Sequence, residues 1–111
     1  MTTPTDNENW LIDIGDSIIN KKAQIGFNSL TDHERLIYCL WVMDYSMRNA
    51  GDLKAAPDVY ANYKDTGLAM AKKLLLNKAA EAFSMDTSNI EKLYFNIFES
   101  LCAEIRNYQI A

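Results

Sequence analysis

The sequence has few of the residues that break or cross-link a chain. Its 111 residues include 4 Gly, 2 Pro and 2 Cys. A collagen-like fibre needs Gly at every third position and a small disulfide scaffold needs many cysteines, so both classes are excluded. Hydrophobic residues make up 49% of the chain, which excludes an intrinsically disordered protein. A chain of this length can bury its own core, and we expect a single domain over residues 1–111.

Long apolar runs and early basic residues are also absent. The longest uninterrupted apolar run covers residues 36–43, and these eight residues fall short of the about 20 that span a bilayer. The first twenty residues contain no Lys or Arg, whereas a secretory signal begins with basic residues. We therefore expect a cytoplasmic protein that does not bind a membrane. In that compartment Cys39 and Cys102 would stay reduced.

The sequence contains none of the familiar motifs of catalytic or metal sites. It has no glycine-rich phosphate loop, no metalloprotease helix motif and no nucleophile elbow. His33 is the single histidine, and Cys39 and Cys102 both lie in apolar stripes, where core packing is their expected role. A zinc site needs three or four ligands, which these residues supply poorly. We predict no catalytic residue, no metal and no cofactor.

The charge is unevenly distributed along the chain. The formal net charge is −4, and residues 21–111 hold 11 acidic and 11 basic residues. The excess therefore comes from Asp6, Glu8, Asp13 and Asp16 near the N-terminus. An acidic chain lacks the basic excess that grips a phosphate backbone, so we expect no direct binding of nucleic acid. These four acids are a candidate interaction face for a basic protein partner, and the alternative is an ordinary solvated helix face.

Apolar residues recur at the three-to-four-residue spacing of helices, and no stretch alternates as a strand does. The spacing predicts helices over about 6–23, from after Thr31 to Asn49 or Ala50, over about 66–83, and behind Ser88, with a short helix beginning at Pro57. Capping boxes are predicted at residues 5–8, 31–34 and 88–91, an N-cap at Asp65, and a left-handed end at Gly51. We expect an all-α, single compact domain, an irregular bundle of four to five helices with residues 1–5 flexible.

One acidic residue interrupts the most apolar helix. Asp44 lies four residues before Arg48, which is the spacing of a helical ion pair. One interpretation is a structural ion pair near the exposed end of the helix. A second is a buried polar contact that orders the turn beginning at Asn49. A third is a pocket between helices that binds a small molecule or a substrate. Its candidate lining is Trp41, Asp44, Tyr45, Arg48, Asn49 and Tyr60.

Leu30-Thr31, Glu34-Arg35 and the apolar helix behind them are followed by the turn at residues 49–53, the aromatic segment 59–63 and the Ala/Leu-rich stretch 68–80. In this order of features, residues 30–80 resemble a bacterial all-α domain family that includes a nineteen-kilodalton DNA-mimic protein. The turn reads Asn-Asn-Gly-Gly-aromatic in the family, and Asn49 and Gly51 match it here. The resemblance implies a non-catalytic, dimerising helical protein. The mimic itself presents carboxylates in place of phosphates and binds a transcription factor.

Together these observations favour a non-catalytic protein that works by protein–protein contact, with a homodimer as the expected assembly. A DNA-mimic-like regulator is one form of this function. An immunity protein or antitoxin that masks a basic toxin site is another, because both need only a rigid acidic surface. The competing class is the small-molecule binder or enzyme with a pocket at Asp44 and Arg48. A deep cavity at those residues would favour that class, and a closed core with acids in a row would favour the first.

Overall fold

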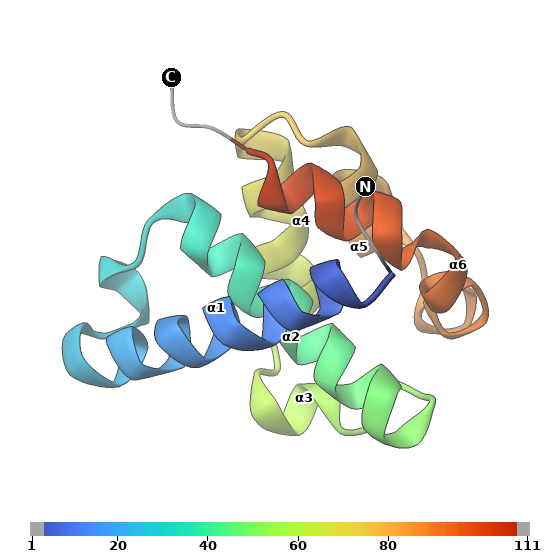
Figure 1. Cartoon of the computed structure of the whole chain (residues 1–111), viewed down its shortest axis with the longest axis horizontal. Coiled ribbons are helices and arrows are strands. Elements are labelled where there is room, and N and C mark those ends of the chain that lie inside the picture. The colour runs from blue at the N-terminus through green and yellow to red at the C-terminus, as the bar shows by residue number, and fades with distance from the viewer. Residues whose placement is uncertain (1–3, 109–111) are drawn as a thin grey trace.

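A computed structural model of the chain describes residues 4–108, and all of its regular secondary structure in that range is helical, without strands. The elements are α1 (Pro4–Ile25), the 3₁₀ turn η1 (Phe27–Ser29), α2 (Asp32–Ala50), α3 (Ala56–Val59), α4 (Tyr63–Lys73), α5 (Asn77–Ser84) and α6 (Thr87–Arg106). The all-α class is confirmed, and the described residues form six α-helices instead of four to five (Figure 1). None of these helices combines the length and apolarity that crossing a bilayer requires.

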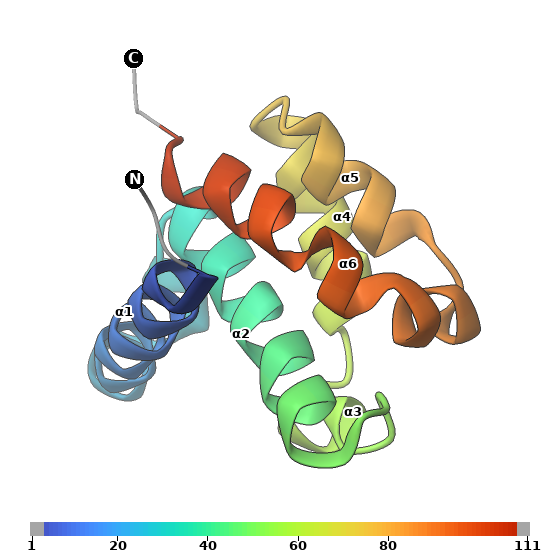
Figure 2. The same ribbon diagram turned by 45° about the vertical axis from the view of Figure 1, so that its right-hand side comes forward.

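Helix α2 is the centre of the fold. It contacts α1, α3, α4 and α6, and Figure 2 shows it passing through the middle with α1 on one side and α4–α6 on the other. The predicted boundaries are confirmed. The Thr31 hydroxyl accepts from the Glu34 amide and the Glu34 carboxylate accepts from the Thr31 amide, which completes the capping box. At the other end Gly51 is left-handed, with φ 73°, and donates to the Met47 carbonyl.

Helix α1 is longer than the sequence predicts. It begins at Pro4, so Thr5 lies within its first turn and the prediction of an N-cap at Thr5 is wrong. Proline suits this first helical position because its missing N–H would have no partner there. Residues 1–3, which we expected to belong to a flexible terminus, lie outside the described residues. Leu11 and Ile18 bury one side of the helix, and Gly15 lets the Trp41 ring of α2 approach its backbone.

The helix predicted over 66–83 is instead two helices. It breaks at Leu75, which adopts a left-handed φ of 61°, and α4 and α5 then pack on each other. The Phe83 ring lies against Gly67, where a Cβ would collide with it. Tertiary packing has therefore overridden local helix propensity at this turn. Asp65, predicted to be an N-cap, lies inside the first turn of α4.

Helix α6 confirms the strongest periodic pattern in the sequence. Its buried stripe is Ile90, Tyr94, Phe98, Leu101, Cys102 and Ile105. The N-cap is Asp86 and not Ser88, because the Asp86 carboxylate accepts from the Asn89 amide at 2.8 Å. Glu91 is consequently one turn inside the helix, where its carboxylate accepts from the Leu53 amide at 2.9 Å. The predicted third capping box is therefore wrong, although the helix behind it is correct.

Candidate functional site

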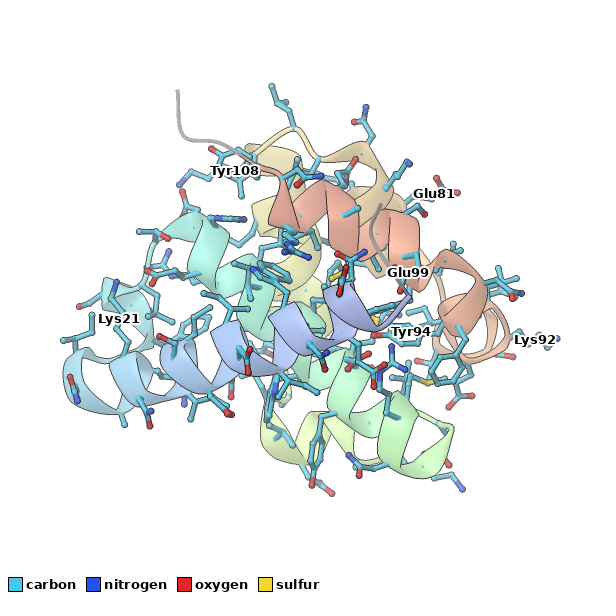
Figure 3. The ribbon with its side chains drawn as sticks, viewed as in Figure 1. Lys21, Glu81, Lys92, Tyr94, Glu99 and Tyr108 are labelled. Atoms are coloured by element: carbon cyan, nitrogen blue, oxygen red, sulfur yellow. The ribbon has the colours of Figure 1, made fainter. Side chains whose placement is uncertain are left out.

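Asp44 is a buried carboxylate at the junction of α2 and α6. Its side chain accepts a hydrogen bond from the Tyr94 hydroxyl at 2.5 Å and two from Arg48 Nε, at 2.9 and 3.1 Å. Asp44 is 5% exposed and Tyr94 is fully buried. The predicted pair of Asp44 and Arg48 is therefore confirmed, and the tyrosine (labelled in Figure 3) is the partner that the sequence did not reveal.

The protonation states in this cluster follow from burial. Desolvation raises the pKa of Asp44, while the hydrogen bonds from Tyr94 and Arg48 oppose that rise. Burial and the neighbouring Asp44 charge hold the pKa of Tyr94 well above its usual range. Tyr94 therefore stays protonated and acts as a hydrogen-bond donor. The Asp44 carboxylate is enclosed and already bonded, which suits a structural contact better than proton exchange with a substrate.

Arg48 joins three helices through its guanidinium group. Besides Asp44 it lies 3.6 Å from the Glu8 carboxylate of α1. The same group lies over the rings of Phe98 and Phe95 of α6, at 4.6 and 5.4 Å from their centroids. The Arg48 side chain is 28% exposed, so most of it is covered by protein while part of its charge still contacts solvent. The contact explains how an arginine near the end of α2 orients both α1 and α6.

The residues predicted to line one pocket fall into two groups. Asp44 and Arg48 face α6, whereas the aromatic members belong to a row of neighbouring rings. Centroid distances along this row run from 5.2 to 6.1 Å through Phe27, Tyr60, Tyr38, Trp41 and Tyr45. Asn49 is exposed and donates to the Tyr45 carbonyl at 2.7 Å. The structure does not bring these side chains together around one cavity, because the nearly complete burial of Asp44 leaves it no opening.

The predicted acidic face is present in part. Asp6, Asp13 and Asp16 are exposed on α1, whereas Glu8 is half-buried and turned toward Arg48. Glu8 therefore does not belong to the face, because the helix places it on the flank that contacts α2. Within residues 4–108, the side chains of Asp13 and Asp16 make no ion pair or hydrogen bond. These two carboxylates are held on a rigid helix and are open to solvent.

A groove runs beside this face, between the start of α1 and the end of α6. It is open, has a volume of about 450 Å³, and is lined by Asp6, Asn9, Trp10, Asp13, Ile14 and Arg106. A neighbouring depression of about 320 Å³ is lined by Asp6, Asn7, Glu99, Ala103, Arg106 and Asn107. We call the first the Trp10 groove and the second the Glu99 depression.

Asn7 builds the wall between α1 and α6 and was missed by the sequence analysis. It is buried, donates to the Glu99 carboxylate at 2.8 Å, and accepts from Arg106 at 3.2 Å. Figure 3 labels Glu99 beside the first turns of α1. These partners lie more than 90 positions apart in the chain, so no local pattern could have connected them. The sequence does place Asn7 four residues before Leu11, on the apolar side of the helix, and a polar residue at such a position could have indicated a buried contact.

The remaining candidate residues have structural roles. Both cysteines are fully buried, as predicted, and burial raises the pKa of each thiol to about 12. His33 Nε2 lies 2.7 Å from the Ile105 carbonyl, and its ring packs on Tyr108. Across the part of the chain that the structure describes, no group of three or more His, Cys, Asp or Glu side chains could hold a metal ion.

Comparison with family models, with curated proteins and with solved structures finds no match to this chain.

Proposed function

We propose that this protein is a non-catalytic interaction module whose outer α1 face binds a basic surface of a protein partner in the cytoplasm. The observation that carries the proposal is the pair of exposed carboxylates at Asp13 and Asp16, which have no partner among the described residues. Asn9 and Asn20 lie on the same outer stripe, so no basic side chain interrupts it. The two lysines of α1 lie elsewhere, with Lys21 on Glu34 at 2.9 Å and Lys22 over the Tyr38 ring.

The three side chains that were the best candidates for chemistry in the competing enzyme hypothesis are buried in the structure. Asp44 is closed off by Tyr94 and Arg48, and the thiols of Cys39 and Cys102 are protonated at neutral pH because burial raises their pKa to about 12. The exposed Asp13 and Asp16 carboxylates, beside a buried and fully bonded Asp44, support the interaction hypothesis over the pocket hypothesis.

The physical benefit of such a face is the rate and selectivity of encounter. Carboxylates on a rigid helix steer a basic surface into place and disfavour acidic partners, while exposed ion pairs add little affinity each. A DNA-binding regulator, as the family resemblance implies, and a basic toxin both present such a surface. The partner's contact surface is therefore basic.

The test compares two variants with the same change of charge. Asp13→Asn/Asp16→Asn neutralises the face, and Asp58→Asn/Glu81→Gln neutralises two exposed acids elsewhere. Immobilised wild-type and variant proteins are incubated with native extract, and bound proteins are quantified by mass spectrometry. We expect a partner that the wild type and the control capture equally, that the face variant loses, and that elutes at about 0.3 M NaCl. Equal capture by both variants would refute the proposal.

A further inference from the structure

The Trp10 groove combines an apolar floor with charged walls. Trp10 and Ile14 are half-buried on the flank of α1 that faces α6, and the Asp6 and Asp13 carboxylates border them. Arg106 closes the other side, with its guanidinium 5.7 Å from the centroid of the Trp10 ring. The Trp10 ring thus already lies beside one cation of the protein itself, an arrangement that the electron-rich face of an aromatic ring favours.

The Glu99 depression continues this surface past Asp6 and Arg106. Both hollows share these two residues as a common wall. Together they present the carboxylates of Asp13 and Glu99 against one guanidinium, from Arg106. Glu99 accepts from the neutral amide of Asn7, so its charge has no ion-pair partner among the described residues. The double hollow is therefore net negative as well as partly apolar.

We propose that this double hollow receives two neighbouring basic side chains, Arg or Lys, from the partner's docking segment. The inference rests on the proposed function and assigns its point of contact. The first side chain lies along Trp10 and Ile14 with its charged end at Asp13, and the second enters the Glu99 depression.

Long basic side chains fit this geometry because they are amphipathic. Their methylene stems cover apolar surface while their charged ends reach water or a carboxylate, and arginine also stacks on aromatic rings. A purely apolar side chain would supply no positive charge to Asp13 or Glu99, and an acidic side chain would be repelled by them. The separation into two hollows favours a pair of basic residues over a single one.

The test uses short peptides whose ends are acetylated and amidated. The probe is Gly-Arg-Arg-Gly, with Gly-Arg-Gly-Gly as the single-charge control and Gly-Cit-Cit-Gly, where Cit is citrulline, as the uncharged control. Binding is followed by ¹⁵N-resolved NMR at low salt. The readout is the indole N–H signal of Trp10, and that of Trp41, in the aromatic row against Gly15, is the internal reference.

We expect the diarginine peptide to shift the Trp10 signal and not that of Trp41, and the citrulline peptide to shift neither. Asp13→Asn, which alters the groove, should weaken binding about three- to fivefold, the size of a well-formed exposed ion pair. Asp16→Asn is the matched control, because Asp16 lies on the same helix outside the groove lining, and it should weaken binding by less than about twofold. Glu99→Gln should remove the difference in affinity between the diarginine peptide and the single-arginine peptide.

The outcomes separate this inference from the proposed function. Equal weakening by Asp13→Asn and Asp16→Asn would overturn the groove and leave the acidic face intact. No shift of Trp10 at millimolar diarginine would also overturn the groove, while capture of a partner that depends on Asp13 and Asp16 together would still support the function. An equal response to the citrulline peptide would show that charge does not select the occupant, and would overturn the assignment.

Discussion

Replacing Tyr94 with Phe removes one hydroxyl from the buried carboxylate of Asp44 and leaves the ring packing unchanged. The hydroxyl donates to Asp44 at 2.5 Å in a place without solvent. A hydrogen bond to a charged group contributes about 1.5–3 kcal/mol, so we expect a loss of that size at pH 7. No unsatisfied donor remains in the variant, because the hydroxyl itself is gone, and Arg48 Nε still bonds to the carboxylate.

The loss should depend on pH in a defined direction. Burial raises the pKa of Asp44 above that of the unfolded chain, so ionising this group makes folding less favourable as pH rises through the interval between the two values. The Tyr94 hydroxyl lowers the pKa of Asp44, and its removal raises that pKa further and widens the interval. The difference between wild type and variant should therefore grow with pH. Below about pH 3 the Asp44 carboxyl is neutral in both the folded and the unfolded chain, and only about 0.5–1.5 kcal/mol of the loss should remain.

The assay is urea unfolding of wild type and Tyr94→Phe across this pH range. Circular dichroism follows the helices, and the fluorescence of Trp10 and Trp41 gives a second probe of two-state behaviour. A double-mutant cycle with Asp44→Asn isolates the coupling between the two side chains. A loss below about 0.5 kcal/mol at neutral pH, within the range of ordinary surface substitutions, would refute the energetic role of this contact. A loss that shrank as pH rose would refute the assigned direction of the pKa.

Three further substitutions test the packing. Leu101→Ala should destabilise by about 2–5 kcal/mol, because Leu101 is 1% exposed and its removal opens a cavity; a loss under about 1 kcal/mol would contradict the position of the α6 stripe. Gly15→Ala should lose about 1–3 kcal/mol in thermal unfolding, since the new Cβ would lie 2.9 Å from Trp41 Nε1; a more stable variant would show that the ring moves freely. Leu75→Gly should stabilise by about 0.5–1 kcal/mol, because Leu75 is left-handed and 82% exposed; calorimetry that found a lower melting temperature would mean that the leucine side chain contributes to folding.

The parts of the fold that were predicted correctly depend on neighbours in the sequence. The Thr31 capping box, Gly51 and the pair of Asp44 and Arg48 each span at most four positions, so local rules suffice to find them. The long apolar stripe of α6 is likewise a property of one segment. Burial of the two cysteines was predicted in the same way, from the apolar run of α2 for Cys39 and from the apolar stripe of α6 for Cys102.

The parts that were missed depend on contacts between distant segments. The break at Leu75 has no Gly to indicate it in the sequence, and it brings Phe83 of α5 against Gly67 of α4. The same is true of the candidate site. Its acidic residues were visible in the sequence, but the groove exists because Arg106 returns to Trp10, and no local pattern reports that approach.

The start of α5 shows how one helix can depend on another for its existence. No side chain of its own caps this eight-residue helix; instead the Glu104 carboxylate of α6 accepts from the Lys78 and Ala79 amides at 3.1 and 2.9 Å. Isolated helices shorter than about 12 residues are marginal in water. Helix α5 packs on α4, but the amides of its first turn depend on α6 for their acceptor, so we expect α5 and the end of α6 to open and close as one cooperative unit. In amide hydrogen exchange, the amides of α5 should lose their protection only when the end of α6 detaches. The stability of α5 is thereby linked to the same helix end that carries Arg106.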